Sequence, residues 1–441
     1  MAPGLAGDAA KSLPTNPTVS ANDWLPGGLL AVCLLLGGGG SPSPASEAAT
    51  QVLCAMLLAA AALRADRWDR PGWRCIALAI LALALPLFHL VPLPPSIWQA
   101  LPGRDAMLGG LTLVRGDAEW RPLSVAPLRT FASLLAVLPP LAILWATAAS
   151  GERAVSRAIV VLVAIAAFSG ILGAVQVGTG GAAGHPYAAT HRGWVTGLFA
   201  NRNAAADLFL AALAGLAVLA VGRAASFRLP AMGLTLLFAA SLLMTGSRTG
   251  IVVAITLCSA AIAFFLVRKV AIARRAIAVG AIGFATVAIA GWALGGARVV
   301  AGRFFATGDM RADIWRDTAD AIGRYWPWGS GMGTFEPAFA ASQRLETLGP
   351  AIVNRAHGDY LELLLEAGLP GIAVLLAAAA IVANAALRPV PPDGAPNRLF
   401  ACAVLGILAL HSLVDYPLRT MALGALAAFA VGILVKPRPA A

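Results

Sequence analysis

The chain has 441 residues, of which 59% are hydrophobic and 12% are charged, and its mean hydropathy is +0.79. So many long apolar runs exclude a soluble protein of several ordinary domains and indicate a polytopic membrane protein. The formal net charge of +11 comes almost entirely from arginine, because the only lysines are Lys11, Lys269 and Lys436.

Apolar runs predict about twelve transmembrane helices and therefore an all-α fold. An α-helix needs roughly 17 to 25 mainly apolar residues to cross a hydrocarbon core about 30 Å thick. In chain order the predicted spans are 25–41, 47–63, 75–94, 129–149, 158–177, 203–222, 229–246, 249–267, 276–296, 367–387, 399–416 and 418–435.

The N-terminal residues 1–24 have no apolar core of their own, so they predict a cytoplasmic tail rather than a cleaved signal peptide. Short loops rich in Lys and Arg stay in the cytoplasm. With this tail inside, the cytoplasmic gaps hold Arg64, Arg67, Arg70, Arg74, Arg153, Arg157, Arg223, Arg228, Arg268, Lys269, Arg274, Arg275, Arg388 and Arg398. We therefore expect spans one to nine over 25–297, an exported loop over 298–366, spans ten to twelve over 367–435, and a cytoplasmic tail over 436–441.

The five cysteines lie within or beside predicted spans, where they are expected to act as small hydrophobic residues. No zinc, iron–sulfur or haem spacing occurs. The stretch GSGMGTF at 329–335 lacks the Gly-Lys-Ser/Thr ending of a phosphate-binding loop. The sequence predicts no metal site, no cofactor and no nucleic-acid partner.

Arginine is also frequent on the predicted exported side. Guanidinium grips phosphate oxygens two at a time and stays charged, so these residues favour an anionic partner there. The alternative is that they solvate loops, pair with nearby acids or reach the lipid headgroups. The exported arginines are Arg104, Arg115, Arg121, Arg192, Arg202, Arg248, Arg298, Arg303, Arg311, Arg316, Arg324, Arg344, Arg355 and Arg419.

Arg248 is a candidate because of its depth. The stretch TGSRTG at 245–250 separates two apolar runs so briefly that Arg248 must lie at or just inside the outer membrane boundary. A charge at that depth is costly unless it faces protein, water or a ligand.

The exported segment after Arg298 is long for a loop of a compact membrane domain, and such loops are usually functional. Apolar or small residues at helical spacing predict an amphipathic helix over 310–325, with Met310, Ile314, Asp317 or Thr318, Ala321 and Tyr325 on one face. Arg311 falls near the helix start, where it opposes the helix dipole. This position favours a ligand role.

His357 precedes a second predicted helix that ends near Gly368 and Pro370. Imidazole titrates near neutrality and can accept a proton from a hydroxyl, and a neighbouring carboxylate can orient it. Asp359, Glu362 and Glu366 recur on another face of this helix. A lone histidine is more often an ordinary interfacial or core residue, so the nearby arginines carry the argument.

The stretch NRAHGDYLELLLEAGLPG at 354–371 resembles the His-bearing motif of the O-antigen ligase and polymerase family. These membrane proteins handle undecaprenyl-diphosphate-linked glycans. Relatives often have Asn or Ser after the motif histidine, where this chain has Gly358. Further stretches resemble the family in the same order: GLFANRNAAADLF at 197–209, TGSRTG at 245–250, RADIWRDTADAIGRYWPWGSGMGTF at 311–335 and HSLVDYPLR at 411–419.

The resemblance implies a GT-C-like membrane glycosyltransferase of the bacterial inner membrane that works at the periplasmic face without a metal and inverts the sugar. It implies that Arg248 and Arg311 neutralise the leaving diphosphate, and that His357 takes the proton of the acceptor hydroxyl. The residues expected to contact the substrate are Arg202, Asn203, Asp359, Glu362 and Arg316. Asp359 and Glu362 could equally orient His357 or lie on a solvated helix face. For His411 and Asp415, packing explains their position about as well as function.

Several alternatives stay open. The acceptor is lipid A core in a ligase and a second lipid-linked glycan in a polymerase, and the choice should reside in loops 95–128, 178–200 and 336–354. A protein O-glycosyltransferase is a third branch. A secondary transporter also fits about twelve spans, but it would place ionisable groups mid-span and show internal repeats, which we do not find.

Overall fold

The structure is a computed structural model that describes residues 21–39, 43–64, 71–221, 223–267, 310–350, 352–389, 391 and 394–437. Over these residues the fold is all-α, apart from two antiparallel two-residue strands, β1 (Pro92–Leu93) and β2 (Arg121–Pro122). The helices are α1 (Leu25–Leu36), α2 (Pro44–Arg64), α3 (Trp73–Leu90), α4 (Pro95–Trp98), α5 (Asp105–Leu113), α6 (Pro127–Ala148), α7 (Glu152–Gly178), α8 (Arg202–Leu219), α9 (Arg228–Met244), α10 (Arg248–Val267), α13 (Arg311–Tyr325), α14 (Phe335–Ala340), α15 (Asp359–Ala386), α16 (Ala395–His411) and α17 (Met421–Val435).

Six helices are long and apolar enough to cross a membrane, namely α2, α3, α6, α7, α8 and α15, and the shorter apolar helices are α1, α9, α16, α17 and the part of α10 over Arg248–Ser259. Together they correspond to every predicted span except 276–296, which lies outside the described residues. The chain is a multi-pass membrane protein by this helix composition. The eleventh span starts earlier than predicted because Pro396 stands in the first turn of α16, where its missing N–H costs no hydrogen bond.

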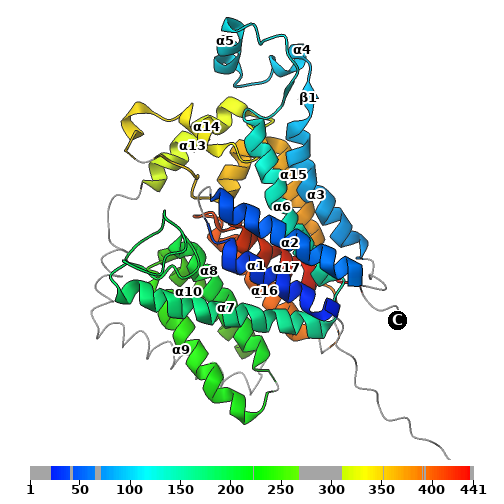
Figure 1. Ribbon diagram of the computed structural model, residues 1–441, viewed down its shortest axis with the longest axis vertical. Coiled ribbons are helices and arrows are strands. Elements are labelled where there is room, and N and C mark those ends of the chain that lie inside the picture. The colour runs from blue at the N-terminus through cyan, green and yellow to red at the C-terminus, as the bar shows by residue number, and fades with distance from the viewer. Residues whose placement is uncertain are drawn as a thin grey trace, which may run out of the picture.

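The main apolar core joins helices from both ends of the chain. It includes Leu29 of α1, Phe209 of α8, Phe400 of α16 and Leu426 of α17, all fully buried. Helix α17 packs against α6, α16 and α1 near the middle of the bundle (Figure 1). This core fixes α8 and α16 side by side.

A second apolar cluster forms above the bundle, between α13, α14 and the start of α15 (Figure 1). The predicted amphipathic helix is confirmed as α13, whose buried residues are Ile314, Asp317, Thr318, Ala321 and Tyr325. Met310, which was predicted to share this face, is instead exposed because it precedes the first helical turn. The cluster holds α13 against α15.

Helix α15 contains the predicted break. Gly368 has a non-helical backbone with φ of 51°, yet helix continues on both sides of it. A side chain there would collide with the carbonyl of Pro327, so the loop after α13 approaches α15 at this glycine. The first part of α15 is thereby tilted against the second part.

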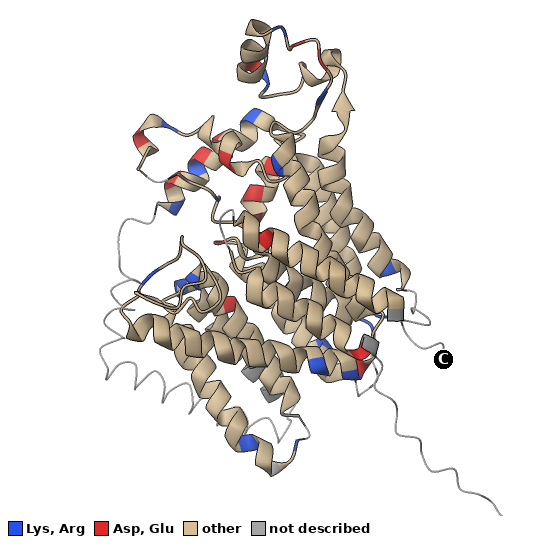
Figure 2. Cartoon of the chain, viewed as in Figure 1, with Lys and Arg blue, Asp and Glu red and all other residues tan. Residues whose placement is uncertain are grey.

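Charged residues gather at two levels of the molecule. Figure 2 shows them around α5, α13 and α14 at one end and at the opposite ends of several helices, while the helices between are mainly uncharged. This distribution suits a membrane protein. The orientation with both termini in the cytoplasm stays a prediction.

Candidate active site

His357 stands two residues before the first residue of α15, in a strained backbone conformation. Its φ is 52°, a region that residues other than glycine enter at a cost of about 1–2 kcal/mol. Trp315 of α13 donates its indole N–H to the carbonyl oxygen of His357 at 3.2 Å, and the imidazole packs edge-on against Tyr416 at 5.2 Å between ring centroids. The side chain is still 30% exposed. Strain of this kind persists where the surroundings enforce it, which is common in active sites.

Asp415 orients the imidazole. It lies in the turn after α16, is 2% exposed, and places Oδ1 3.3 Å from Nδ1 of His357. Its other oxygen, Oδ2, accepts a hydrogen bond from Nδ2 of Asn203 at the start of α8. A carboxylate acceptor at Nδ1 selects the tautomer with the proton on Nδ1 and leaves Nε2 as a proton acceptor.

The charge of Asp415 is maintained by its surroundings. Burial raises the pKa of this carboxyl, but the hydrogen bond with His357 and the positive charges of His411 and Arg311 lower the pKa by more, to below its ordinary value. Arg311 is thus within electrostatic reach of Asp415. The carboxylate is therefore ionised at neutral pH.

Three predicted arginines begin helices: Arg202 is the first residue of α8, Arg248 of α10 and Arg311 of α13. Each of the three side chains is partly buried. The N-terminus of a helix carries a partial positive charge, so arginine is electrostatically unfavourable there unless an anion is present. Arg228 also begins a helix, but its side chain is exposed to the surroundings. Partial burial distinguishes the three candidates from this residue.

Trp194 joins the starts of α8 and α10. The guanidinium of Arg202 stacks over its ring at 5.0 Å. The same ring covers Gly246, whose φ is +60° and where any Cβ would collide with the indole. Gly250 in the first turn of α10 packs against Ala206 of α8. Arg202 and the stretch 245–250 that carries Arg248 therefore lie next to each other around Trp194.

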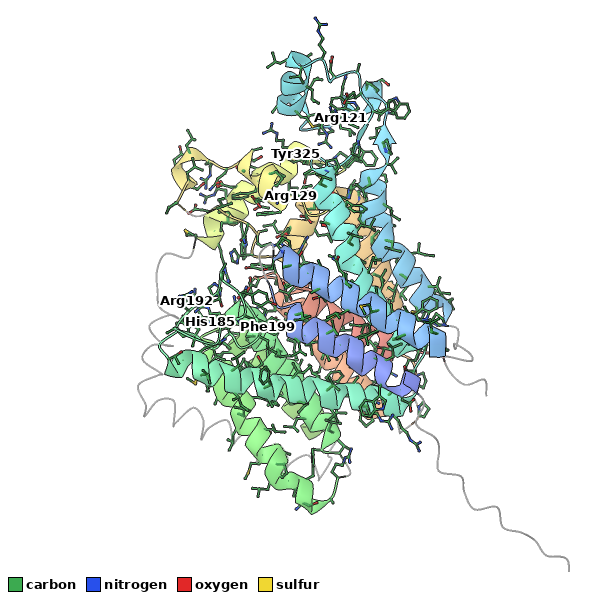
Figure 3. The ribbon with its side chains drawn as sticks, viewed as in Figure 1. Arg121, Arg129, His185, Arg192, Phe199 and Tyr325 are labelled. Carbon is green, nitrogen blue, oxygen red and sulfur yellow. The ribbon has the colours of Figure 1, made fainter. Side chains whose placement is uncertain are left out.

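The start of α13 lies on the side of His357, because Trp315 is one turn after Arg311 and bonds to the His357 backbone. Figure 3 shows the labelled Tyr325 at the far end of α13, and Arg192 and His185 on the loop between α7 and α8. The structure thus brings His357 and Asn203 together on Asp415, with the start of α13 on the side of His357 and Arg202 at the start of the helix that bears Asn203.

An acidic face of α15 is buried around Arg419. This guanidinium lies 3.6 Å from Asp359, 3.3 Å from Glu362 and 2.7 Å from Glu366, and Arg355 adds a bond of 2.9 Å to Glu362. Burial lowers the pKa of Arg419, but the three carboxylates raise it well above its ordinary value. The alternative that this face is solvated is wrong, because Arg419 from a distant part of the chain covers it.

The same cluster ties together the segments that carry the site. Ser412 donates its hydroxyl to Asp359 at 2.8 Å, and its carbonyl accepts the Asp359 N–H at 3.0 Å. Glu366 accepts the N–H of Phe335 at 3.1 Å. The start of α15, the turn that bears Asp415 and the loop before α14 are therefore one unit. This arrangement fixes the separation of His357 and Asp415.

Arg316 lies apart from this group. Its side chain is 65% exposed and sits 3.8 Å from Asp313 on the outer face of α13. The sequence left the role of Asp415 undecided and gave Arg419 no role. In the structure Asp415 contacts His357, and Arg419 holds the acidic face of α15. Both lie in the quoted stretch HSLVDYPLR, which was the available signal.

Comparison with known families follows this geometry. A family model described as O-antigen ligase (Wzy_C) matches residues 233–376. Residues 233–376 belong to the O-antigen ligase domain family. The predicted resemblance is thus confirmed, and the family implies a glycan-transferring enzyme of surface polysaccharide assembly. Arg248, Arg311 and His357 lie inside the matched stretch, whereas Asp415 lies outside it. Comparison with curated proteins gives no match.

The described part of the chain holds no group of three His, Cys, Asp or Glu side chains placed to bind one metal ion. The cationic groups near His357 are guanidinium groups instead. These can neutralise a phosphate without a bridging ion.

Proposed function

We propose that the protein transfers a glycan from an undecaprenyl-diphosphate donor to an acceptor hydroxyl at the periplasmic face of the bacterial inner membrane, as an O-antigen ligase does. The observation that carries the proposal is the imidazole of His357, oriented by buried Asp415, beside helix starts that bear arginine. A diphosphate bound there would supply the anion that these helix starts favour.

The roles follow from the chemistry of the transfer. The bond between the anomeric carbon and the diphosphate oxygen breaks, and its electron pair leaves on the diphosphate. Arg248 and Arg311 neutralise this charge as it develops. The acceptor oxygen forms the new bond from the opposite side, which inverts the sugar, and its proton passes to Nε2 of His357. The imidazolium then releases this proton to water.

The other candidates take distinct roles. We assign Arg202 a role in binding the diphosphate, because it lies next to the stretch that carries Arg248. Asn203 holds Asp415. Asp359 and Glu362 are positioning residues, because their oxygens face Arg419 and Arg355. Membrane lipids surround the spans.

A complementation experiment tests this function. His357→Ala, Arg248→Ala and Arg311→Ala are expressed in cells that lack the gene, and surface polysaccharide is separated on gels. Arg228→Ala is the matched control, because it also removes an arginine from the first residue of a helix but lies on the predicted cytoplasmic side.

We expect each of the three site variants to abolish the attached polysaccharide and the control to keep it. If lipid-linked chains remain long, the enzyme is a ligase whose acceptor is lipid A core. If single attached repeats remain, it is a polymerase that uses a second lipid-linked glycan as acceptor. Unchanged banding for all three site variants contradicts the catalytic assignment.

A further inference from the structure

A second acid–imidazole pair lies beneath the candidate site, between α8 and α16. Nδ1 of His411 is 2.6 Å from Oδ1 of Asp207, and neither side chain is more than 1% exposed. The two helices that carry the pair also supply residues of the main apolar core, including Phe209 of α8 and Leu408 of α16. Ionisable groups buried in a membrane bundle are costly, so they are retained chiefly where they have a function.

The pair is the lower of two polar contacts between the same elements. Asn203 and Asp207 are four residues apart and share one face of α8. His411 and Asp415 are also four apart, and the N–H of Asp415 donates to the carbonyl of His411 at 2.9 Å, which continues the helical turn. The contact of Asn203 with Asp415 therefore lies about 6 Å, roughly one turn, above the contact of Asp207 with His411.

The charged and titratable groups around His411 come from four elements. Asp207 from α8, Asp415 from the turn after α16 and Arg311 from α13 act on His411 itself, and His357 from the segment before α15 contacts Asp415. Nε2 of His411 and Oδ2 of Asp207 are buried and have no hydrogen-bond partner. The proposed transfer uses neither side chain, so the pair still needs an explanation.

We propose, on the basis of the transfer reaction above, that Asp207 and His411 are positioning residues. Asp207 holds His411 as an imidazolium, and that positive charge, one turn below Asp415, keeps Asp415 ionised and able to orient His357. The pair touches no reacting atom and acts by its charge on Asp415 and, through Asp415, on His357.

The pH dependence of transfer tests this role. Asp415 and His357 must both be free of an added proton to act, and a nearby positive charge weakens proton binding at both. Loss of that charge in His411→Gln therefore moves the acid limb of the rate profile to higher pH, by on the order of one pH unit. Asp207→Asn should move it in the same direction by less, because His411 then binds its proton less tightly.

The experiment uses the full chain in lipid nanodiscs, with an undecaprenyl-diphosphate glycan and its acceptor, and follows release of undecaprenyl diphosphate between pH 5 and 9. Leu408→Ala is the matched control, because it removes buried volume from α16 one turn before His411 without removing charge. It should lower stability and leave the acid limb unmoved. Asp207→Asn preserves side-chain shape and provides the test if His411→Gln does not assemble.

An acid limb that stays in place in the folded His411→Gln or Asp207→Asn variant overturns the positioning role. An equal shift in Leu408→Ala also overturns it, because the effect would then be structural. Failure of the proposed function looks different, since the wild-type chain would then release no undecaprenyl diphosphate at any pH.

Discussion

Replacing Asp415 with asparagine tests whether the carboxylate holds His357 by charge rather than by shape. Asparagine has nearly the same volume, so the turn after α16 keeps its packing. It cannot, however, offer a negative charge to the imidazole and to Asn203 at once. The substitution therefore separates the electrostatic role from the structural one.

The expected loss follows from the contacts of Asp415. A hydrogen bond to a charged group contributes about 1.5–3 kcal/mol, and each 1.36 kcal/mol lost from the transition state lowers the rate tenfold. If the bond to His357 acts mainly when the imidazolium forms, the transfer rate should fall about 100-fold. The KM for the donor should change by less than about threefold, because Asp415 does not touch the donor.

The assay is release of undecaprenyl diphosphate by purified protein under single-turnover conditions. Asp320→Asn is the matched control, because Asp320 is exposed on α13 and the chemical change is identical. The control should stay within about twofold of wild type. A rate for Asp415→Asn within about threefold of wild type would refute the reasoning, because the imidazole would then work without its carboxylate.

Three further predictions concern stability. Arg419→Met removes the cation that three buried carboxylates share and should lower the free energy of unfolding by about 3–5 kcal/mol, visible as a lower melting temperature in detergent. In Gly246→Ala the added Cβ collides with the indole of Trp194, at a backbone position with positive φ. The free energy of unfolding should fall by about 1–3 kcal/mol, measured by melting, and the transfer rate should also fall, measured by product release. The pKa of Asp415 lies below its ordinary value, so its stabilising effect is complete above about pH 4 and is lost as the pH falls through the lowered pKa. The melting temperatures of wild type and Asp415→Asn should therefore differ most at neutral pH and begin to converge below about pH 4.

Each of these variants has a control. Arg115→Met removes an exposed arginine and should leave the melting temperature unchanged. Gly233→Ala lies in α9 with open space around its Cβ position, so it should be neutral or slightly stabilising. If a control lost as much stability as the site variant with which it is paired, the argument from burial would be wrong. A stability difference that does not shrink as the pH falls below about 4 would contradict the assignment for Asp415.

Most of the architecture was accessible from the sequence because it depends on local patterns. Apolar runs set the spans, and helical spacing set the buried face of α13. The same spacing places Arg316 about 200° around the helix from Ile314, on the exposed side, so its separation from the site could also have been predicted.

The remaining features depend on distant parts of the chain. The periodicity of Asp359, Glu362 and Glu366 marks a face of α15, but it does not say that Arg419 covers this face. The positive φ of His357 is likewise imposed by its neighbours and has no local signature. The carboxylate that orients His357 is 58 residues further on, which hydropathy cannot reveal.

The most direct test of the central claim is a cryo-EM structure of the chain in lipid nanodiscs with undecaprenyl diphosphate bound. We predict that the diphosphate contacts the guanidinium groups of Arg202, Arg248 and Arg311 at the starts of α8, α10 and α13, with Nε2 of His357 facing the position of the sugar. A diphosphate bound elsewhere, or one that none of these arginines touches, would contradict the account.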